Sequence, residues 1–184
     1  MAAGDLCTLA DVRNWLTLTG TTDDTLISAA ITSLSDAMQT WMNRQIASQS
    51  YTEQRDGVGS VRLSFANYPV SAVASLSVDG ISIPPAATPQ ATGFYFNTKQ
   101  IFLNDYSFTK GFGNILMIYT AGYAAVPPEL KQAAIQLVSE KYKERQHIGQ
   151  KNKIVDKETL GFDVNDFPAY VKTMMNNYKK VICV

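Results

Sequence analysis

The residues able to bind a metal or act as a nucleophile are few and widely separated in this sequence. Its only histidine is His147, and its two cysteines, Cys7 and Cys183, lie near opposite ends of the chain. A structural zinc site needs four Cys or His ligands, usually in closely spaced pairs. Two distant cysteines also do not make the disulfide framework of a small secreted domain. We therefore expect two free thiols, a surface histidine and no metal site.

The glycines, serines and carboxylates form no catalytic pattern either. Residues 111–113 (Gly-Phe-Gly) lack the rest of a dinucleotide-binding fingerprint. No serine follows a strand and opens a helix, as the serine of a nucleophile elbow does. Acid pairs such as Asp23-Asp24 and Asp163 with Asp166 are placed to cap helices rather than to exchange protons with a substrate. The sequence thus predicts no enzymatic activity and no cofactor.

Aromatic and basic residues alternate in one segment, a pattern typical of proteins that bind single-stranded nucleic acid. The segment contains Tyr106, Phe108, Lys110 and Phe112. No wider group of basic residues accompanies it. We therefore favour a second interpretation, in which this hairpin tip or loop packs on a neighbouring subunit.

Charge and hydropathy restrict the partners of the chain. Its 184 residues include 16 Lys and Arg against 16 Asp and Glu, and 46% of them are hydrophobic. A dedicated nucleic-acid-binding protein usually has a basic surplus, because its affinity comes largely from counterions released at phosphates. No segment approaches the roughly 20 apolar residues that span a bilayer, and the N-terminus does not resemble a signal peptide. We expect a globular protein made in the cytoplasm, with no membrane partner.

Four helices are predicted, two toward each end of the chain. Thr8 and Asp11 are spaced to cap the first helix, which Gly20 ends. The second helix has apolar residues at steps of three and four and should extend to about Arg44. Prolines 127 and 128 begin the third helix, and the last begins near Pro168.

The middle of the chain has the alternation and the turn residues of β hairpins. Asp79-Gly80 is a strong signal for a two-residue hairpin turn. The nearly continuous apolar strand at 114–119 should be buried on both faces or lie at a subunit contact, and the polar residues 147–166 should form an extended loop. The predicted strands are residues 61–65, 72–78, 81–83, 93–96, 100–103 and 114–119.

Together these elements predict a mainly α fold with a β insertion. The helices at about 8–45 and 127–182 would form a four-helix-bundle-like arrangement, and a hairpin-rich insertion would occupy about 51–123. A chain of this length can form one domain with its own core. We expect residues 1–184 to be that single domain.

Several short motifs occur in the order and spacing found in head–tail connector (adaptor) proteins of tailed bacteriophages. The most specific is Tyr-Thr-Ala-Gly-Tyr at 119–123, followed after three residues by Pro-Pro-Glu-Leu at 127–130. The chain resembles this family from about Thr8 to Tyr178. The other motifs are Thr-Leu-Ala-Asp-Val-Arg-Asn-Trp-Leu at 8–16, Asp23-Asp24, Asn43-Arg44, Tyr-Thr-Glu at 51–53, Asp56-Gly57, Pro-Val-Ser-Ala-Val at 69–73 and Val-Asp-Gly at 78–80.

The resemblance implies a structural virion subunit at the head–tail interface. Such subunits form a homo-oligomeric ring, typically of twelve copies, under the portal protein. The ring extends the channel through which double-stranded DNA passes without specific binding, and it offers a docking surface to a tail-side neck or tail-completion protein. Family members lack enzymatic activity. The alternatives are a tail-completion or neck protein that binds the tail tube, and a DNA-packaging accessory that binds nucleic acid.

Candidate residues follow for each contact. A closed ring needs a heterologous interface, with two different patches on each subunit, and surplus apolar residues on the second helix and on the 114–119 strand could form one. The subunit-contact candidates are Ile31, Met38, Ile115, Met117 and Tyr119. The portal-binding candidates, which the resemblance places in the C-terminal segment, are Val171, Met174, Met175, Tyr178, Val181, Ile182 and Val184. The candidates for loops that face the channel or the tail are Tyr106, Phe108, Lys110, Phe112, Lys151 and Lys153.

Overall fold

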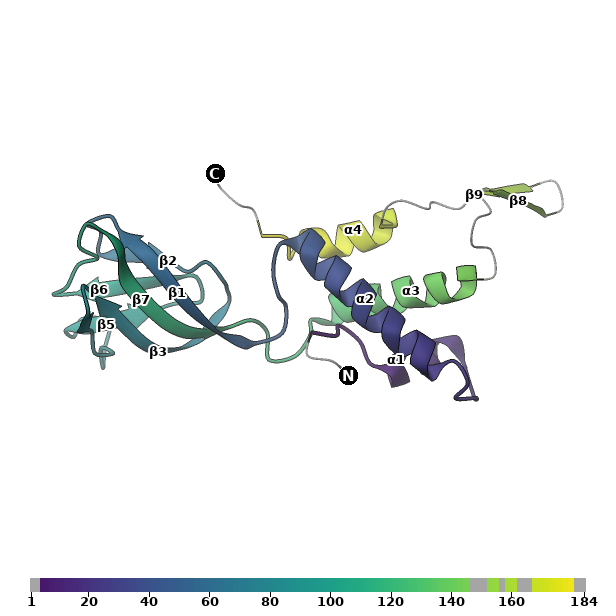
Figure 1. Ribbon diagram of the computed structural model, residues 1–184, viewed down its shortest axis with the longest axis horizontal. Helices are drawn as coiled ribbons and strands as arrows, with labels where there is room; N and C mark the ends of the chain where they lie inside the picture. The colour runs from purple at the N-terminus through teal and green to yellow at the C-terminus, as the bar shows by residue number, and fades with distance from the viewer. Residues whose placement is uncertain (1–3, 146–151, 156–157, 162–166, 181–184) are drawn as a thin grey trace. The chain divides into compact units, whose positions relative to one another are not determined.

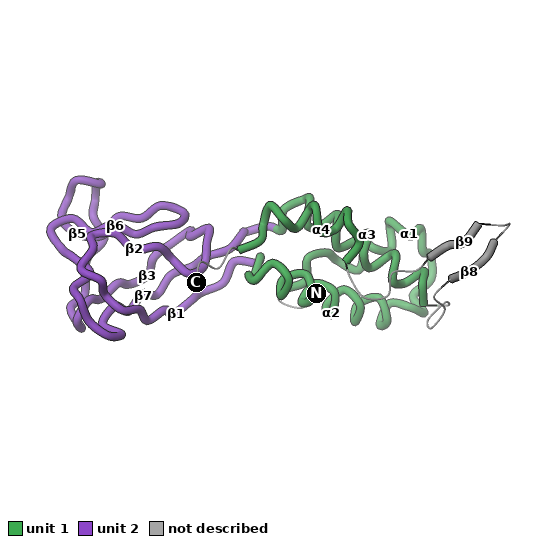
Figure 2. The backbone as a smooth tube through the Cα atoms, turned by 90° about the horizontal axis from the view of Figure 1, so that it is seen from above, with its two compact units in different colours: residues 1–46, 126–184 green, residues 47–125 purple. Residues whose placement is uncertain are grey.

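The computed structural model describes residues 4–145, 152–155, 158–161 and 167–180. The chain divides into two compact units, which Figure 2 distinguishes by colour. We call Met1–Ile46 together with Val126–Val184 the helical unit, and Ala47–Ala125 the β unit. The β unit is thus inserted in the sequence between the second and third helices.

The first two helices begin and end at residues suited to these positions. Helix α1 (Leu9–Leu16) starts with the predicted capping box, in which the Thr8 hydroxyl accepts from the Asp11 N–H at 3.1 Å and the Asp11 carboxylate accepts from the Thr8 N–H at 3.0 Å. It ends before Gly20, because Thr17 already takes a left-handed conformation. Helix α2 (Asp24–Met42) ends in the same way at Asn43, a residue type that tolerates this conformation.

Helix α3 (Pro128–Glu144) is the centre of the helical unit. It contacts α1, α2 and the last helix, α4 (Ala169–Asn176), all labelled in Figure 1. A helix with neighbours on several sides buries more than one stripe of residues. Those buried on α3 are Leu130, Ala133, Ala134, Ile135, Leu137, Val138 and Ser139. The core of this unit is therefore built around α3.

The larger sheet of the β unit has the strand order β1-β7-β3-β4, with antiparallel neighbours throughout. Its strands are β1 (Gln49–Gly57), β3 (Val70–Val78), β4 (Ile81–Ser82) and β7 (Gly111–Ala121). The long strand β7 pairs with β1 on one side and β3 on the other. The predicted turn at Asp79 and Gly80 joins β3 to β4, with φ angles of 52° and 77° as such a tight turn requires.

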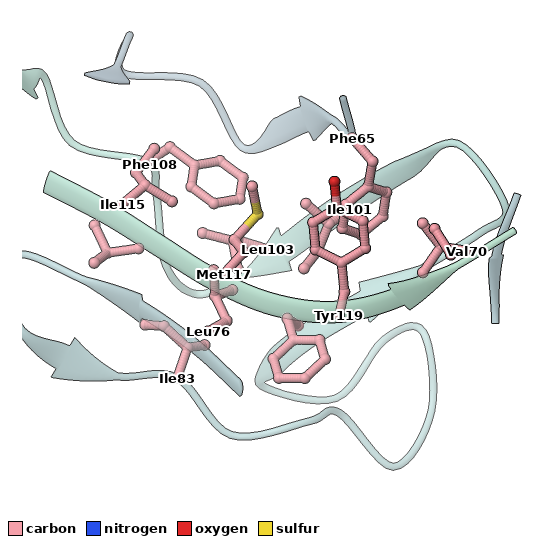
Figure 3. Packing of buried hydrophobic residues seen from close by; sticks show 13 residues of the cluster. Phe65, Val70, Leu76, Ile83, Ile101, Leu103, Phe108, Ile115, Met117 and Tyr119 are labelled. Atoms are coloured by element: carbon pink, nitrogen blue, oxygen red, sulfur yellow. The ribbon is translucent and has the colours of Figure 1, made fainter. Parts of the chain in front are cut away.

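A smaller antiparallel sheet completes the β unit. It has the order β2-β6-β5, formed by β2 (Arg62–Ser64), β5 (Gly93–Phe96) and β6 (Gln100–Asn104). Both sheets contribute to one buried apolar cluster, in which Met117 and Tyr119 of β7 lie with Ile101 and Leu103 of β6 (Figure 3). Since alternate residues of a strand face opposite sides, Leu116 of β7 points outward. Strand β7 thus buries one face, not two.

A short hairpin lies within the segment that was predicted to be an extended loop. Its strands, β8 (Asn152–Val155) and β9 (Glu158–Gly161), pair with each other in antiparallel register. Neither strand pairs with another strand of the described chain. The prediction of a loop without secondary structure was therefore wrong for these eight positions.

The prediction of a mainly α fold was also wrong. The protein is a mixed α/β structure, with roughly as many residues in strands as in helices and two antiparallel sheets in its β unit. The sequence pattern did not reveal β1, whose half-buried positions include Glu53 and Arg55. Charged residues at these positions remove the alternation of apolar and polar residues by which a half-buried strand is recognised.

The inward-facing acid of β1 has partners inside the β unit. The Tyr119 hydroxyl donates a hydrogen bond to Glu53 Oε2, and the Ala66 N–H donates to the same oxygen at 3.3 Å. Arg55 pairs with the other carboxylate oxygen at 2.6 Å. Burial of the Tyr119 side chain, together with the adjacent carboxylate, raises its pKa to about 12. The hydroxyl therefore remains a proton donor at neutral pH.

Replacing Tyr119 by Phe measures how much the hydrogen bond between Tyr119 and Glu53 stabilises the fold. The substitution keeps the aromatic volume but removes the hydroxyl that donates to the Glu53 carboxylate and accepts from the Asn67 N–H, so we expect the free energy of unfolding to fall by about 1–3 kcal/mol in urea titrations. Tyr51→Phe is the control, because that ring stacks on Tyr119 while its hydroxyl bonds only the exposed Gln49 side chain. Equal losses in the two variants would contradict a special role for the buried bond.

Candidate assembly surfaces

The described residues present no chemical centre. No group of three or more His, Cys, Asp and Glu side chains among them could hold a metal ion. Burial raises the pKa of the Cys7 thiol to about 12, which keeps this thiol protonated and unreactive. Within the same residues, no helix is both long and apolar enough to cross a bilayer. His147 and Cys183 lie outside the described residues.

The four sequence candidates in the segment that leads into β7 differ sharply in exposure. Phe108 is fully buried in the core of the β unit, whereas Tyr106 and Lys110 are exposed and Phe112 is 95% exposed. Of the two lysines grouped with them, Lys151 lies outside the described residues and only the backbone of Lys153, in β8, is described. Of the candidates whose side chains are described, Tyr106, Lys110 and Phe112 lie at the surface.

A network of polar side chains holds the end of the β unit that carries Phe112. Asn114 is its centre: its amide donates to Asp79 Oδ1 at 2.9 Å, and its carbonyl oxygen accepts from the Gly57 N–H at 2.9 Å. The Thr109 hydroxyl also donates to Asp79. Hydrogen bonds from Thr109 and Asn114 lower the pKa of Asp79 below its ordinary value. Three loops are therefore tied together by one amide and one carboxylate.

The three residues that open β7 are held by a second pair of bonds. The Gly113 N–H donates to Asp56 Oδ1 at 2.6 Å, and the Gln54 amide donates to the Gly113 carbonyl at 2.7 Å. Both partners belong to β1. In this stretch β7 is accompanied by β1 alone, because β3 ends at Val78, opposite Ile115. Phe112 therefore projects from a backbone that is fixed on one flank.

A shallow hollow lies on the other flank of β7. It has a volume of about 500 Å³ and is lined by Val78, Ile81 and Ile83 of the β3–β4 hairpin region and by Tyr106. Asp79 and Asp105 add two carboxylates to its lining. Ile81 is 65% exposed although it is a large aliphatic residue. Sequence analysis did not find this hollow, because its two halves come from segments more than 20 residues apart.

All five subunit-contact candidates are buried in the hydrophobic cores of the two units. Their side chains are at most 2% exposed, with Ile31 and Met38 in the helical unit and the three β7 residues in the β unit. These three are Ile115, Met117 and Tyr119. The apolar surplus that suggested an interface is used by the cores, because α2 packs against three helices and β7 faces a second sheet.

The portal-binding candidates include both buried and partly exposed side chains. Val171 and Met175 of α4 are fully buried, and Met174 and Tyr178 are partly exposed. After α4 the chain is attached to the end of α2, where the Lys180 N–H donates to the Met42 carbonyl at 2.9 Å. The remaining candidates, Val181, Ile182 and Val184, lie outside the described residues.

A partly exposed polar cluster joins α2 to α3. Asp23 was expected to cap α2, but its side chain makes no capping bond. Its carboxylate instead accepts from the Tyr142 hydroxyl and pairs with the Arg145 guanidinium at 3.1 Å. The guanidinium also lies over the Tyr142 ring, 4.1 Å from its centre. The hydrogen bonds from Tyr142 and Arg145 lower the pKa of Asp23. The cluster is structural and resembles no acid–base pair.

Comparison with protein families gives one decisive match. The model of the family described as "Head completion protein" matches residues 5–181, which is nearly the whole chain and includes both units. The chain belongs to the head completion protein family. This confirms the resemblance to phage head–tail connector proteins and, with it, a structural role in joining head to tail.

Solved structures give this head completion protein the same fold as neck components of gene transfer agent particles. A chain from the neck of an empty particle, computed with C6 symmetry, aligns with a TM-score of 0.63 and 18% identity, covering 100% of this chain and 95% of that one. A chain from the neck of the native particle, computed with C12 symmetry, aligns with a TM-score of 0.57, also at 18% identity and with the same coverage. A search of curated protein sequences gave no match.

The Asp23 cluster gives a prediction with a definite pH dependence. A carboxyl whose pKa is lowered in the folded protein stabilises it above the ordinary value of 3.8, and this contribution is lost as the pH falls through the lowered pKa. Asp23→Asn should therefore reduce the free energy of unfolding at neutral pH, and the difference from wild type should shrink in acid. Asp36→Asn, an exposed site on the same helix, is the control. A difference that stays constant down to acid pH would refute the assignment.

Proposed function

We propose that the chain forms a closed homo-oligomeric ring, a dodecamer, at the head–tail interface of a virion, between the portal protein and a tail-side neck or tail-completion protein. The observation that carries this proposal is the coverage of the structural matches. Both units of the chain align with 95% of a protein from particle necks computed with C6 and C12 symmetry. A symmetry of this kind is what a ring of six or twelve equivalent copies produces.

The charge of the chain supports a passive conduit for DNA. Equal numbers of basic and acidic residues leave a net charge of zero. Each phosphate that a protein neutralises adds salt-dependent affinity, and such affinity would hinder DNA sliding through the ring. A DNA-packaging accessory would instead need a basic stripe. The same neutrality permits a second role, as a tail-completion protein on the tail tube, and the experiment below separates the two.

Light-scattering mass of the purified protein, alone and mixed with the portal protein of the same virion, tests the proposal. A connector should form a complex that contains the portal protein and about twelve copies of the 20.2 kDa chain. A protein that stays monomeric and ignores the portal, but binds the tail tube, would be a tail-completion protein. A protein that binds neither would contradict the proposal.

We further propose that the C-terminal segment makes the portal contact. Val171 and Met175 are buried in the packing of α4, which leaves the partly exposed Met174 and Tyr178 and the residues that follow Lys180; we assign the contact to the latter. Removing residues 181–184 should abolish association with the portal and leave the unfolding temperature unchanged, since the described contacts of α4 remain. The control is Met174→Ala within α4, which should retain binding if the contact is confined to the last residues. Full portal binding by the truncated protein would refute this assignment.

A further inference from the structure

We propose that neighbouring copies in the ring join through Phe112 of one β unit and the hollow beside β4 of the next. This inference rests on the proposed ring and names its contact. The occupant of the hollow is thus a second copy of this chain, which inserts an aromatic side chain flanked by a lysine. The side chains that receive it are the apolar lining of the hollow and the two carboxylates at its edge.

Phe112 has the properties of an inserting side chain. It is 95% exposed, more than any other large apolar residue in the described chain. Its neighbours along β7 are anchored to β1 through the Gly113 bonds to Asp56 and Gln54. An aromatic ring on a fixed backbone loses little conformational freedom when it is buried against a partner. Such anchors commonly carry most of the binding energy of an interface.

The hollow has the matching chemistry. Its apolar wall is formed by Val78, Ile81 and Ile83 with the Tyr106 ring, and its volume of about 500 Å³ is ample for one phenyl group. The aliphatic side chain of Ile81 is 65% exposed. Burial by a neighbouring copy would therefore remove two exposed apolar surfaces from water at once.

Charge sets the orientation of the contact. Lys110, two residues before Phe112, is exposed, and its stem lies against Gly59, where an added Cβ would come within 3.4 Å of Lys110 Cγ. The hollow carries the carboxylates of Asp79 and Asp105. Hydrogen bonds that lower the pKa of Asp79 keep it ionised at neutral pH. A cation beside the inserted ring thus meets two anions beside the hollow. This charge complementarity favours contact between the Phe112 patch and the hollow over contact between two Phe112 patches or two hollows.

Phe112 and the hollow are separate patches of the β unit. Phe112 lies where β7 is flanked by β1 only, and the hollow lies on the side of β3 and β4. In the proposed ring the contact is heterologous: Phe112 of one copy enters the hollow of the next, so each copy keeps one free patch after the first contact. Copies therefore add head to tail until the ring closes.

Mixing two variants tests this inference directly. Phe112→Asp removes the inserting side chain but keeps the hollow, and Ile81→Asp spoils the hollow but keeps Phe112. Neither variant alone should form rings in light scattering. An equimolar mixture should form a dimer and nothing larger, because only one of the two possible contacts is intact. Both residues are highly exposed, so the variants should keep the unfolding temperature of wild type.

Tyr95→Asp is the matched control. It places the same charge on an exposed aromatic position of the β unit, on β5 of the smaller sheet, and should still form rings. Normal rings from Phe112→Asp or Ile81→Asp would overturn the inference and leave the proposed function intact. Failure of the wild-type protein to assemble, alone or on the portal, would overturn both.

Cross-linking covers the case in which rings form only on the portal. A chain with Phe112→Cys and a chain with Ile81→Cys, both carrying Cys183→Ser, should be joined by a short bismaleimide after co-assembly. The remaining cysteine, Cys7, is buried. The pair Tyr95→Cys with Ile81→Cys should give no product. Equal yields from both pairs, or no product from the first, would overturn the contact.

Discussion

The pairing of the two segments that enter and leave the β unit is the constraint on which the architecture depends. Ala47 and Tyr123 form a bridge, and the Ser48 N–H donates to the Tyr123 carbonyl at 3.1 Å. Gly122 makes this possible: its φ of 117° and the Ala47 carbonyl, 2.5 Å from where a Cβ would be, exclude any larger residue without rearrangement. Because the two segments begin and end together, a β unit can be inserted between α2 and α3 while those helices share one core.

Polar side chains in this protein secure particular contacts between elements that are distant in sequence. Glu53 lies on an edge strand, yet its carboxylate meets Tyr119 and the Ala66 N–H. A charged residue facing inward on an edge strand also discourages that edge from pairing with foreign strands. Asp23, placed to cap α2, holds the last turn of α3 instead. In both cases a carboxylate is satisfied by a tyrosine hydroxyl, and the bond defines which elements pack together.

The division of apolar residues between core and surface bears on assembly. Ile31, Met38, Ile115, Met117 and Tyr119 are consumed by the two cores, so a ring of these chains must use other side chains. Phe112 and Ile81 are the two most exposed large apolar side chains of the described β unit. A structural protein of a particle needs such surfaces more than it needs a pocket, because its function is to hold identical copies and different partners in fixed register.

Local features of this protein were determined by the sequence alone: the capping box at Thr8, the turn at Asp79-Gly80, the proline-initiated α3 and the absence of a pattern for catalysis. Each depends on residues within a few positions of one another, and the ordered motifs from 8 to 130 were sufficient to indicate the family. The tertiary structure alone decided that β1 is a strand, that the 114–119 candidates are core, and that Phe112 and the hollow are surface. These outcomes depend on which distant segments meet, because a side chain is buried only when another segment of the chain packs over it.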